Sequence, residues 1–407
     1  MSRKAPTAAE ATQSAPGPLS LPFEDRHQRP GRSAPGEPGR GMRVELPRLR
    51  IANFSYRLPV AGRKRGGIER SAHTLADGLA RRGHSMVVFT HDPKPEGAAY
   101  TVRPLPWKRF VDTWLGRRVT MGYLGNALAL LPDYREFDAI IAHGDSLLLP
   151  LAGKPVVRVL HGSALGEARS ARSLGRFLLQ CGVYGQELLT ALLQDGVVGV
   201  SENARRDNPF VGRVIPHGVD DRVFVPGPEP RTPEPSVVFV GTLAGRKRGR
   251  FLLDVFSRHV RPVFPRASLA VVGEQGPATA GVTYHTGLVD GELAALYRRA
   301  WVYASPSTYE GFGLPYLEAL ACGTPVVATP NPGSIEVLGN GEYGRLPGDP
   351  DFGPALTALL GDAAARATLA ARGLARAREF PLAVMLDRYE DLLFALVATH
   401  AKSVASA

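Results

Sequence analysis

Residues 300–329 read AWVYASPSTYEGFGLPYLEALACGTPVVAT, and this stretch decides the fold. The apolar residues 300–307 predict a short strand. Residues 315–322 predict a helix that ends at Gly323, and residues 325–329 predict the next strand. Ligands of open α/β sheets bind at the carboxyl ends of the strands. We therefore expect the loop between this first strand and the helix to bind a ligand.

That loop places two glycines beside a carboxylate, in an arrangement that suits a nucleotide sugar. Gly311 and Gly313 let backbone amides approach a ligand closely, and the helix start presents unpaired N–H groups and a positive dipole end to phosphate. Glu318, inside the helix, is placed to accept hydrogen bonds from two adjacent ribose hydroxyls, and Glu310 to reach the sugar or the transferring centre. Taken alone, the residues also fit two ordinary solvated carboxylates. The candidate donor-binding residues are Gly311, Phe312, Gly313, Leu314 and Glu318, and Glu310 is a candidate catalytic residue.

The run from residue 293 to residue 337 resembles the donor-binding signature of the family 4 retaining glycosyltransferases, including their two glutamates with seven residues between them. The resemblance covers about residues 47–397. It implies the GT-B fold, an α/β architecture in which two Rossmann-like domains face each other across a cleft. It also implies that a C-terminal helix crosses back to the N-terminal domain.

Length and composition agree with two globular domains. The 407 residues exceed what one hydrophobic core normally serves, and 44% hydrophobic with 21% charged residues is ordinary for such a chain. Residues 1–45 are rich in Pro, Gly, Ser, Ala and Arg without periodicity, which predicts a disordered tail. The resemblance then assigns residues 46–228, together with the returning helix 380–397, to the acceptor-side domain. It assigns residues 229–379 to the nucleotide-sugar-binding domain.

The sequence also bears on compartment. Cys181 and Cys322 are too few for a disulfide framework and match no metal-ligand spacing. No run of about 18 apolar residues predicts a spanning helix, and no signal-peptide pattern opens the chain. We expect a cytoplasmic protein, soluble or peripheral at the inner face of the membrane. Met42 directly precedes the first predicted strand, so residues 1–41 are either an extension or the product of a misplaced start.

Basic residues are concentrated in one part of the chain. Residues 46–235 hold 26 Lys and Arg against 18 Asp and Glu, whereas the segments on either side are close to balance. On the acceptor-side domain, this charge suits an anionic acceptor or an anionic membrane surface; a basic solvated surface without a partner is the other interpretation. Residues 107–131 mix aromatic, leucine and basic residues. They fit a membrane-binding amphipathic helix, and a packed helix with solvated arginines is the interpretation we prefer.

The first domain opens with a second ligand-binding pattern. A strand over residues 49–55, the turn at Gly66 and Gly67, and a helix through Gly83 form a Rossmann-type half with a phosphate-compatible turn. The turn resembles the family's glycine-rich loop, and the basic run 63–65 lies beside it. Two later predicted strands each end on a histidine followed by a glycine. A histidine at such a strand end is more often a packing residue, but His161 matches the family position that contacts the donor sugar, so it is preferred over His143.

The second domain follows a Pro-rich linker at residues 226–235. Just before that linker, His217 stands in a Pro-His-Gly-Val-Asp segment where most relatives have Asn. Beyond the linker, Arg246 and Lys247 follow a predicted strand and are suited to neutralise a leaving diphosphate. Exposed basic turns are common, so the resemblance carries this assignment. Thr242 replaces an arginine of one family form, which makes Lys247 the more secure of the two cations.

The resemblance implies sugar transfer from a nucleoside diphosphate with retention at the anomeric carbon. His161, Glu310, Lys247 and Arg246 are the expected catalytic residues, and no metal or other cofactor is expected. The one Asp-x-Asp pattern, at residues 349–351, is flanked by proline and is predicted to be a turn.

The acceptor is not identified by the sequence: a glycan, a lipid-linked intermediate and a small molecule all remain open. Two other functions remain open as well, a sugar-nucleotide epimerase of the same fold and a non-catalytic nucleotide-sugar binding protein. Nucleic acid is not an expected partner, because no aromatic-basic recognition motif is present.

Overall fold

A computed structural model describes residues 47–59, 66–106, 129–144, 146–171 and 173–406. Three predictions lie wholly or mostly outside this part of the chain: the tail over residues 1–45, the basic run 63–65 and the amphipathic segment 107–131. They remain predictions.

The first domain is built on a seven-stranded parallel sheet in the order β3-β2-β1-β4-β5-β6-β7. Its central strands are apolar and buried along their length, as expected for a parallel sheet with helices on both faces. The strands are β1 (Arg50–Phe54), β2 (Ser85–Thr90), β3 (Thr101–Pro104), β4 (Ala139–Ala142), β5 (Val156–Leu160), β6 (Gly196–Gly199) and β7 (Arg213–Val214).

The second domain repeats the design with a five-stranded parallel sheet in the order β10-β9-β8-β11-β12. In both sheets the strand order reverses beside the first strand of the domain, β1 or β8. Such switch points are where open α/β sheets bind ligands. The strands are β8 (Ser236–Val240), β9 (Ser268–Val272), β10 (Val282–His285), β11 (Val302–Ser305) and β12 (Val326–Ala328). The chain is therefore an α/β protein with two Rossmann-like domains, as the sequence predicted.

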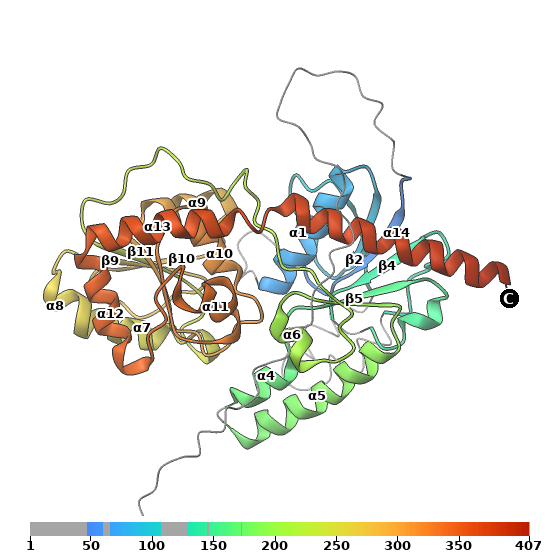
Figure 1. The fold of residues 1–407 in the computed structure, drawn as a ribbon, viewed down its shortest axis with the longest axis horizontal. Coiled ribbons are helices and arrows are strands. Elements are labelled where there is room, and N and C mark those ends of the chain that lie inside the picture. Colours follow the sequence, from blue (N-terminus) through green and yellow to red (C-terminus); the bar gives the residue numbers. More distant parts are fainter. Residues whose placement is uncertain (1–46, 60–65, 107–128, 145, 172, 407) are drawn as a thin grey trace, which may run out of the picture. The chain divides into compact units, whose positions relative to one another are not determined.

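Helices connect the strands in each domain (Figure 1). Those that follow strands of the first sheet are α1 (Gly67–Arg81), α4 (Ala164–Arg169), α5 (Leu174–Leu192) and α6 (Glu202–Asp207). Those associated with the second sheet are α7 (Gly249–Val255), α8 (Arg261–Val263), α9 (Asp290–Arg299), α10 (Leu314–Ala321), α11 (Pro332–Val337), α12 (Asp349–Gly361) and α13 (Ala363–Ala377). None of the described helices combines the length and the apolar run needed to cross a bilayer.

The last helix, α14 (Leu382–Ser406), returns to the first domain, as predicted. It packs against α1, where the missing side chain of Gly78 makes room: a Cβ there would lie 2.6 Å from Leu386 Cδ1. Arg82, at the end of α1, bonds to Glu390 of α14 at 2.6 Å. The helix runs past the predicted end at residue 397 because its last residues are rich in Ala, which favours helix without burial.

One local prediction was wrong. The expected turn at residues 349–351 is instead the first turn of α12, where acidic residues favour the helix dipole and Pro350 needs no donor. Asp349 pairs there with Arg248 at 2.7 Å.

Candidate donor-binding site

A cleft of about 660 Å³ is lined by loops at the carboxyl ends of strands from both domains. The two sides meet closely: a Cβ on Gly311 would overlap the carbonyl oxygen of His161, so only glycine fits. Tyr309 also holds the two sides together. The amide of Ser163 donates to the Tyr309 hydroxyl at 2.7 Å, and that hydroxyl donates to the Ser163 carbonyl at 3.2 Å. The cleft contains every candidate residue except Glu318, namely Gly66, Gly67, His161, Arg246, Lys247, Glu310, Gly311, Phe312, Gly313 and Leu314.

Glu310 lies at the centre of a three-residue ion cluster in this cleft. Its Oε1 is 2.6 Å from Lys247 Nζ, and its Oε2 is 2.8 Å from Arg246 Nη1. The residue is 5% exposed. Burial alone would raise the pKa of Glu310, but the charges of Lys247 and Arg246 outweigh burial and hold that pKa below its usual value. Glu310 is therefore a carboxylate, and the cluster carries one net positive charge.

The chain positions these cations through a tight basic turn after β8. Residues Gly245–Lys247 form one turn of 3-10 helix, and Arg248 follows in the left-handed region with φ 56°. The carbonyl of Arg246 accepts a hydrogen bond from the Thr308 amide at 2.9 Å, which ties this turn to the loop after β11. The loop that carries Glu310 and the turn that carries its two cations are thus joined through their backbones.

Three histidines form a stacked column beside the cluster. His143 Nδ1 is hydrogen-bonded to His161 Nε2 at 2.9 Å, with the two rings 5.1 Å apart, and the ring of His217 lies 5.6 Å beyond His161. His217 Nδ1 is 3.3 Å from the Ser71 hydroxyl of α1. The prediction preferred His161 over His143, but the structure brings both histidines together.

His143 and His217 are buried, His161 is partly exposed, and all three imidazoles are held neutral. Burial, followed by the neighbouring histidines, lowers the pKa of His161 well below its usual value. Burial and His217 lower the pKa of His143 to about 3, and burial and Arg70 lower that of His217 to about 4. The column can therefore accept or donate hydrogen bonds without carrying a charge. Nδ1 of His161 and Nε2 of His143 are buried with no hydrogen-bond partner among the described groups.

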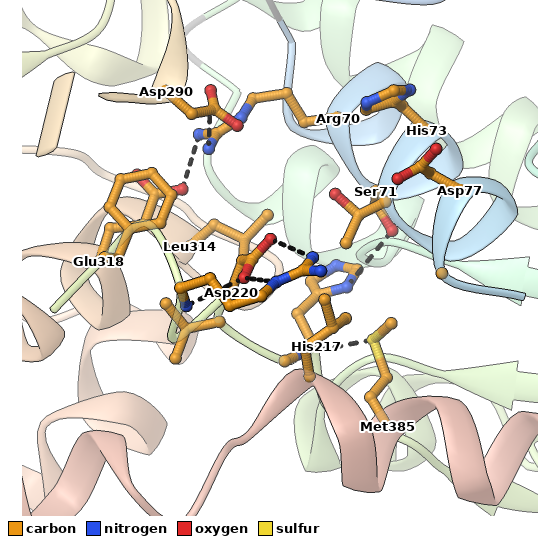
Figure 2. A pocket seen from close by; sticks show the side chains of 17 residues that line it. Arg70, Ser71, His73, Asp77, His217, Asp220, Asp290, Leu314, Glu318 and Met385 are labelled. Atoms are coloured by element: carbon orange, nitrogen blue, oxygen red, sulfur yellow. Dashed lines mark hydrogen bonds and ion pairs between the residues drawn. The ribbon is translucent and has the colours of Figure 1, made fainter. Parts of the chain in front are cut away.

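Glu318 lines a smaller cavity of about 100 Å³, which shares Arg70, His217 and Asp290 with the main cleft (Figure 2). Arg70 reaches across from α1 and pairs with Glu318 at 2.6 Å and with Asp290 at 3.5 Å. Tyr297 donates a further hydrogen bond to Glu318 at 3.3 Å. Burial raises the pKa of Glu318, and Arg70 offsets part of that rise. The carboxylate expected to bind ribose is thus occupied by an arginine of the first domain.

Both predicted glycine turns open helices into the cleft. Gly313 has φ 97°, which only glycine adopts without strain, and it begins α10 with no side-chain cap. Gly66 begins α1, also without a side-chain cap, and the Glu69 carboxylate folds back next to it. Phe312 packs edge-on against the His217 ring at 5.5 Å. In the first turn of α10, Pro315 has no N–H and the Tyr316 amide donates to the Gly313 carbonyl at 2.9 Å, which leaves the Leu314 amide as the candidate donor to a ligand.

Among the described residues, no group of three or more His, Cys, Asp or Glu side chains is arranged to hold a metal ion. Cationic side chains supply the positive charge in the cleft instead. Arg70, Ser71 and His217 were not predicted as site residues. Arg70 and Ser71 could have been found from their position in the first turns after the predicted glycine pair. His217 could have been found because it replaces the Asn that most relatives have.

Two family models match the chain in succession. The model described as Glycosyltransferase Family 4 matches residues 65–223, and the model described as Glycosyl transferases group 1 matches residues 234–362. Each falls within one of the two Rossmann-like domains: the first match begins after β1, and the second ends before α13. Both describe glycosyl transferases, so the epimerase alternative gains no support from them.

Similar proteins agree with these matches. An MMP alpha-(1->4)-mannosyltransferase of Mycolicibacterium hassiacum is 34% identical over 51% of this chain and 50% of its own. A phosphatidyl-myo-inositol mannosyltransferase of Mycobacterium tuberculosis is 28% identical over 83% of this chain and 94% of its own. The chain spans about half the length of several curated relatives it matches. Among solved structures, Anabaena HepE in complex with UDP-glucose has a TM-score of 0.65 and 18% identity over 85% of this chain and 100% of that chain.

Proposed function

Because the chain belongs to glycosyltransferase family 4, we propose that it transfers a sugar from a nucleoside-diphosphate sugar to an acceptor with retention at the anomeric carbon. The observation that carries this proposal is the Glu310 cluster, which places two cations beside a buried carboxylate at the point where the two domains meet.

The chief electrostatic demand of this reaction is the negative charge that develops on the leaving diphosphate. Lys247 and Arg246 are the groups we assign to it, together with the positive dipole end and the Leu314 amide at the start of α10. Glu310 pairs with both cations and keeps them in the cleft. On donor binding, the diphosphate shares them with Glu310. No metal ion is needed in this scheme, since the two cations and the helix dipole neutralise the diphosphate charge.

We assign the remaining donor contacts to two residues. Glu318 binds the ribose hydroxyls once Arg70 leaves it, and His161 binds the sugar from the opposite wall through its unpartnered nitrogen. HepE was crystallised with UDP-glucose, which makes uracil the first nucleobase to test. One relative is a phosphatidyl-myo-inositol mannosyltransferase, so lipid-linked acceptors stand first among those to test. We place the protein in the cytoplasm, peripheral to the membrane.

The proposal is tested by titrating the protein with UDP-, GDP-, ADP- and TDP-sugars in a calorimeter, with and without EDTA. One sugar nucleotide should bind selectively and without dependence on EDTA. Lys247→Met and Glu318→Gln should each weaken it, whereas the exposed matched controls Lys402→Met and Glu342→Gln should not. If no nucleotide sugar binds, the proposal fails. Binding without transfer to any acceptor would favour the non-catalytic binding protein.

A further inference from the structure

Two histidines at the ends of neighbouring strands share a hydrogen bond. His143 follows β4 and His161 follows β5, and these two strands pair in parallel. His143 Nδ1 lies 2.9 Å from His161 Nε2, and the two ring planes differ by 24°. The His143 amide donates to the Phe54 carbonyl at 3.0 Å, and the residue is 3% exposed. His143 is therefore held in place, and its ring fixes the orientation of the His161 ring.

The tautomers of these two rings are coupled. Both imidazoles are neutral, because burial holds the pKa values of His143 and His161 well below the usual range. Each ring then carries one proton on one of its two nitrogens. Two bare nitrogens or two N–H groups at 2.9 Å would repel each other, so a single proton lies between the rings. The position of the proton on one ring therefore determines its position on the other.

Two arrangements of the protons satisfy this condition. In the first, Nδ1–H of His143 donates to Nε2 of His161, and His161 carries its own proton on Nδ1. In the second, Nε2–H of His161 donates to Nδ1 of His143, and His143 carries its own proton on Nε2. His161 Nδ1 and His143 Nε2 are both buried with no hydrogen-bond partner among the described groups. Each arrangement therefore leaves one buried N–H unsatisfied, which is costly.

A ligand in the cleft distinguishes the two arrangements. His161 lines the donor-binding cleft, whereas His143 is absent from the described residues that line it. In the first arrangement, an oxygen of a bound sugar can accept from Nδ1–H of His161, which satisfies the remaining proton. In the second, Nε2–H of His143 stays unsatisfied, and the sugar meets a bare nitrogen. Donor binding therefore favours the first arrangement.

We propose that His143 is a positioning residue for the donor: by donating to Nε2 of His161, it makes His161 present Nδ1–H to an oxygen of the bound sugar. This inference rests on the proposed function, in which His161 contacts that sugar. It also states what the site requires of the donor, namely a sugar oxygen that accepts a hydrogen bond at this wall of the cleft.

The first test observes the tautomer in the full-length wild type. Long-range ¹H–¹⁵N correlation spectra of protein labelled with ring-¹⁵N histidine distinguish a protonated ring nitrogen from a bare one. The signals that are missing from His161→Gln assign the His161 ring. The ligand is the sugar nucleotide that binds from the panel of UDP-, GDP-, ADP- and TDP-sugars. In that complex, His161 should carry a proton on Nδ1 and none on Nε2, and any other protonation of His161 would overturn the inference.

The second test compares two variants of nearly equal side-chain size. His143→Asn keeps an N–H donor near the position of Nδ1, whereas His143→Leu has none. In calorimetric titrations, His143→Leu should raise the donor Kd about tenfold, and His143→Asn should stay within about threefold of the wild type. Equal weakening by both variants would assign His143 to packing alone, and unchanged binding by His143→Leu would remove it from donor binding. Either result overturns the inference. If a variant does not fold in urea-unfolding controls, the wild-type spectrum alone decides.

The two tests separate this inference from the proposed function. A wild type that binds no nucleotide sugar defeats the proposed function, and the inference fails with it. A wild type that binds its donor while Nδ1 of His161 is bare defeats the inference alone.

Discussion

Replacing Arg70 with methionine should make the protein less stable and yet bind its donor more tightly. Arg70 Nη1 lies 2.6 Å from Glu318 Oε1, and the two side chains are 15% and 2% exposed. Methionine keeps much of the length of the arginine side chain but cannot pair with a carboxylate. The substitution therefore leaves Glu318 buried with only the hydrogen bond from Tyr297.

The two effects have different magnitudes. Removing one partner of a buried ion pair costs up to about 3–5 kcal/mol of unfolding free energy. The loss should be smaller here, because Glu318 can take up a proton when its pKa rises further. To reach Glu318, the ribose must displace the hydrogen bond between Arg70 and Glu318, and such a bond between charged groups contributes about 1.5–3 kcal/mol. Because Arg70→Met removes this bond beforehand, the substitution should lower the donor Kd by about 10- to 150-fold.

The assay is calorimetric titration of wild type and Arg70→Met with the donor found in the panel, beside urea unfolding of both proteins. Arg222→Met is the control, since Arg222 lines the same small cavity but pairs with Asp220 at 2.8 Å instead of with Glu318. It should leave the donor Kd unchanged. A donor Kd that stays the same or rises in Arg70→Met would refute the idea that Arg70 and ribose compete for Glu318.

Three further predictions concern the cleft. Lys247→Met should raise the donor Kd about 100-fold, because it removes a charge-assisted contact to phosphate. The same calorimetric titration measures this change. A change under threefold, about 0.7 kcal/mol, would contradict the role of Lys247. Gly311→Ala should lower the unfolding free energy by about 1–3 kcal/mol, because its methyl group overlaps the His161 carbonyl; urea unfolding measures this, and unchanged stability would mean that the loops do not meet. The folded protein lowers the pKa values of His143, His161 and His217, so these histidines bind protons more readily in the unfolded chain. The unfolding free energy should therefore fall as the pH drops below 6.5, by about 1.4 kcal/mol per pH unit for each histidine. His143→Phe should reduce that slope by about this amount between pH 6 and 4, and an unchanged slope would show that His143 is not buried and neutral.

The sequence predicted the fold because the pattern that specifies it is local. Apolar runs such as residues 300–307, closed by glycine and proline, determine strands and turns without reference to the rest of the chain. The predicted two-domain α/β architecture and the returning C-terminal helix are confirmed. The start of α12 at Asp349 was missed, since an Asp-Pro-Asp segment fits both a turn and the first turn of a helix.

The pairings inside the site could not be predicted, because they join distant residues. Arg70 and Glu318 are 248 positions apart, and nothing near either one indicates the other. The exposure of leucines on α5, such as Leu178 and Leu189, was missed for a different reason: a periodic row of leucines predicts burial, and only the structure shows that the opposite side of the helix is anchored. The roles of His161, Glu310 and the two cations remain predictions.

A crystal structure with the bound nucleoside-diphosphate sugar tests the donor site most directly. We expect diphosphate oxygens within hydrogen-bonding distance of Lys247 and Arg246 and in front of the first turn of α10, both ribose hydroxyls on Glu318, and Arg70 moved away from that carboxylate. A nucleotide bound elsewhere, or one in the cleft with Arg70 still paired to Glu318 and the ribose on other groups, would contradict this assignment of the donor site.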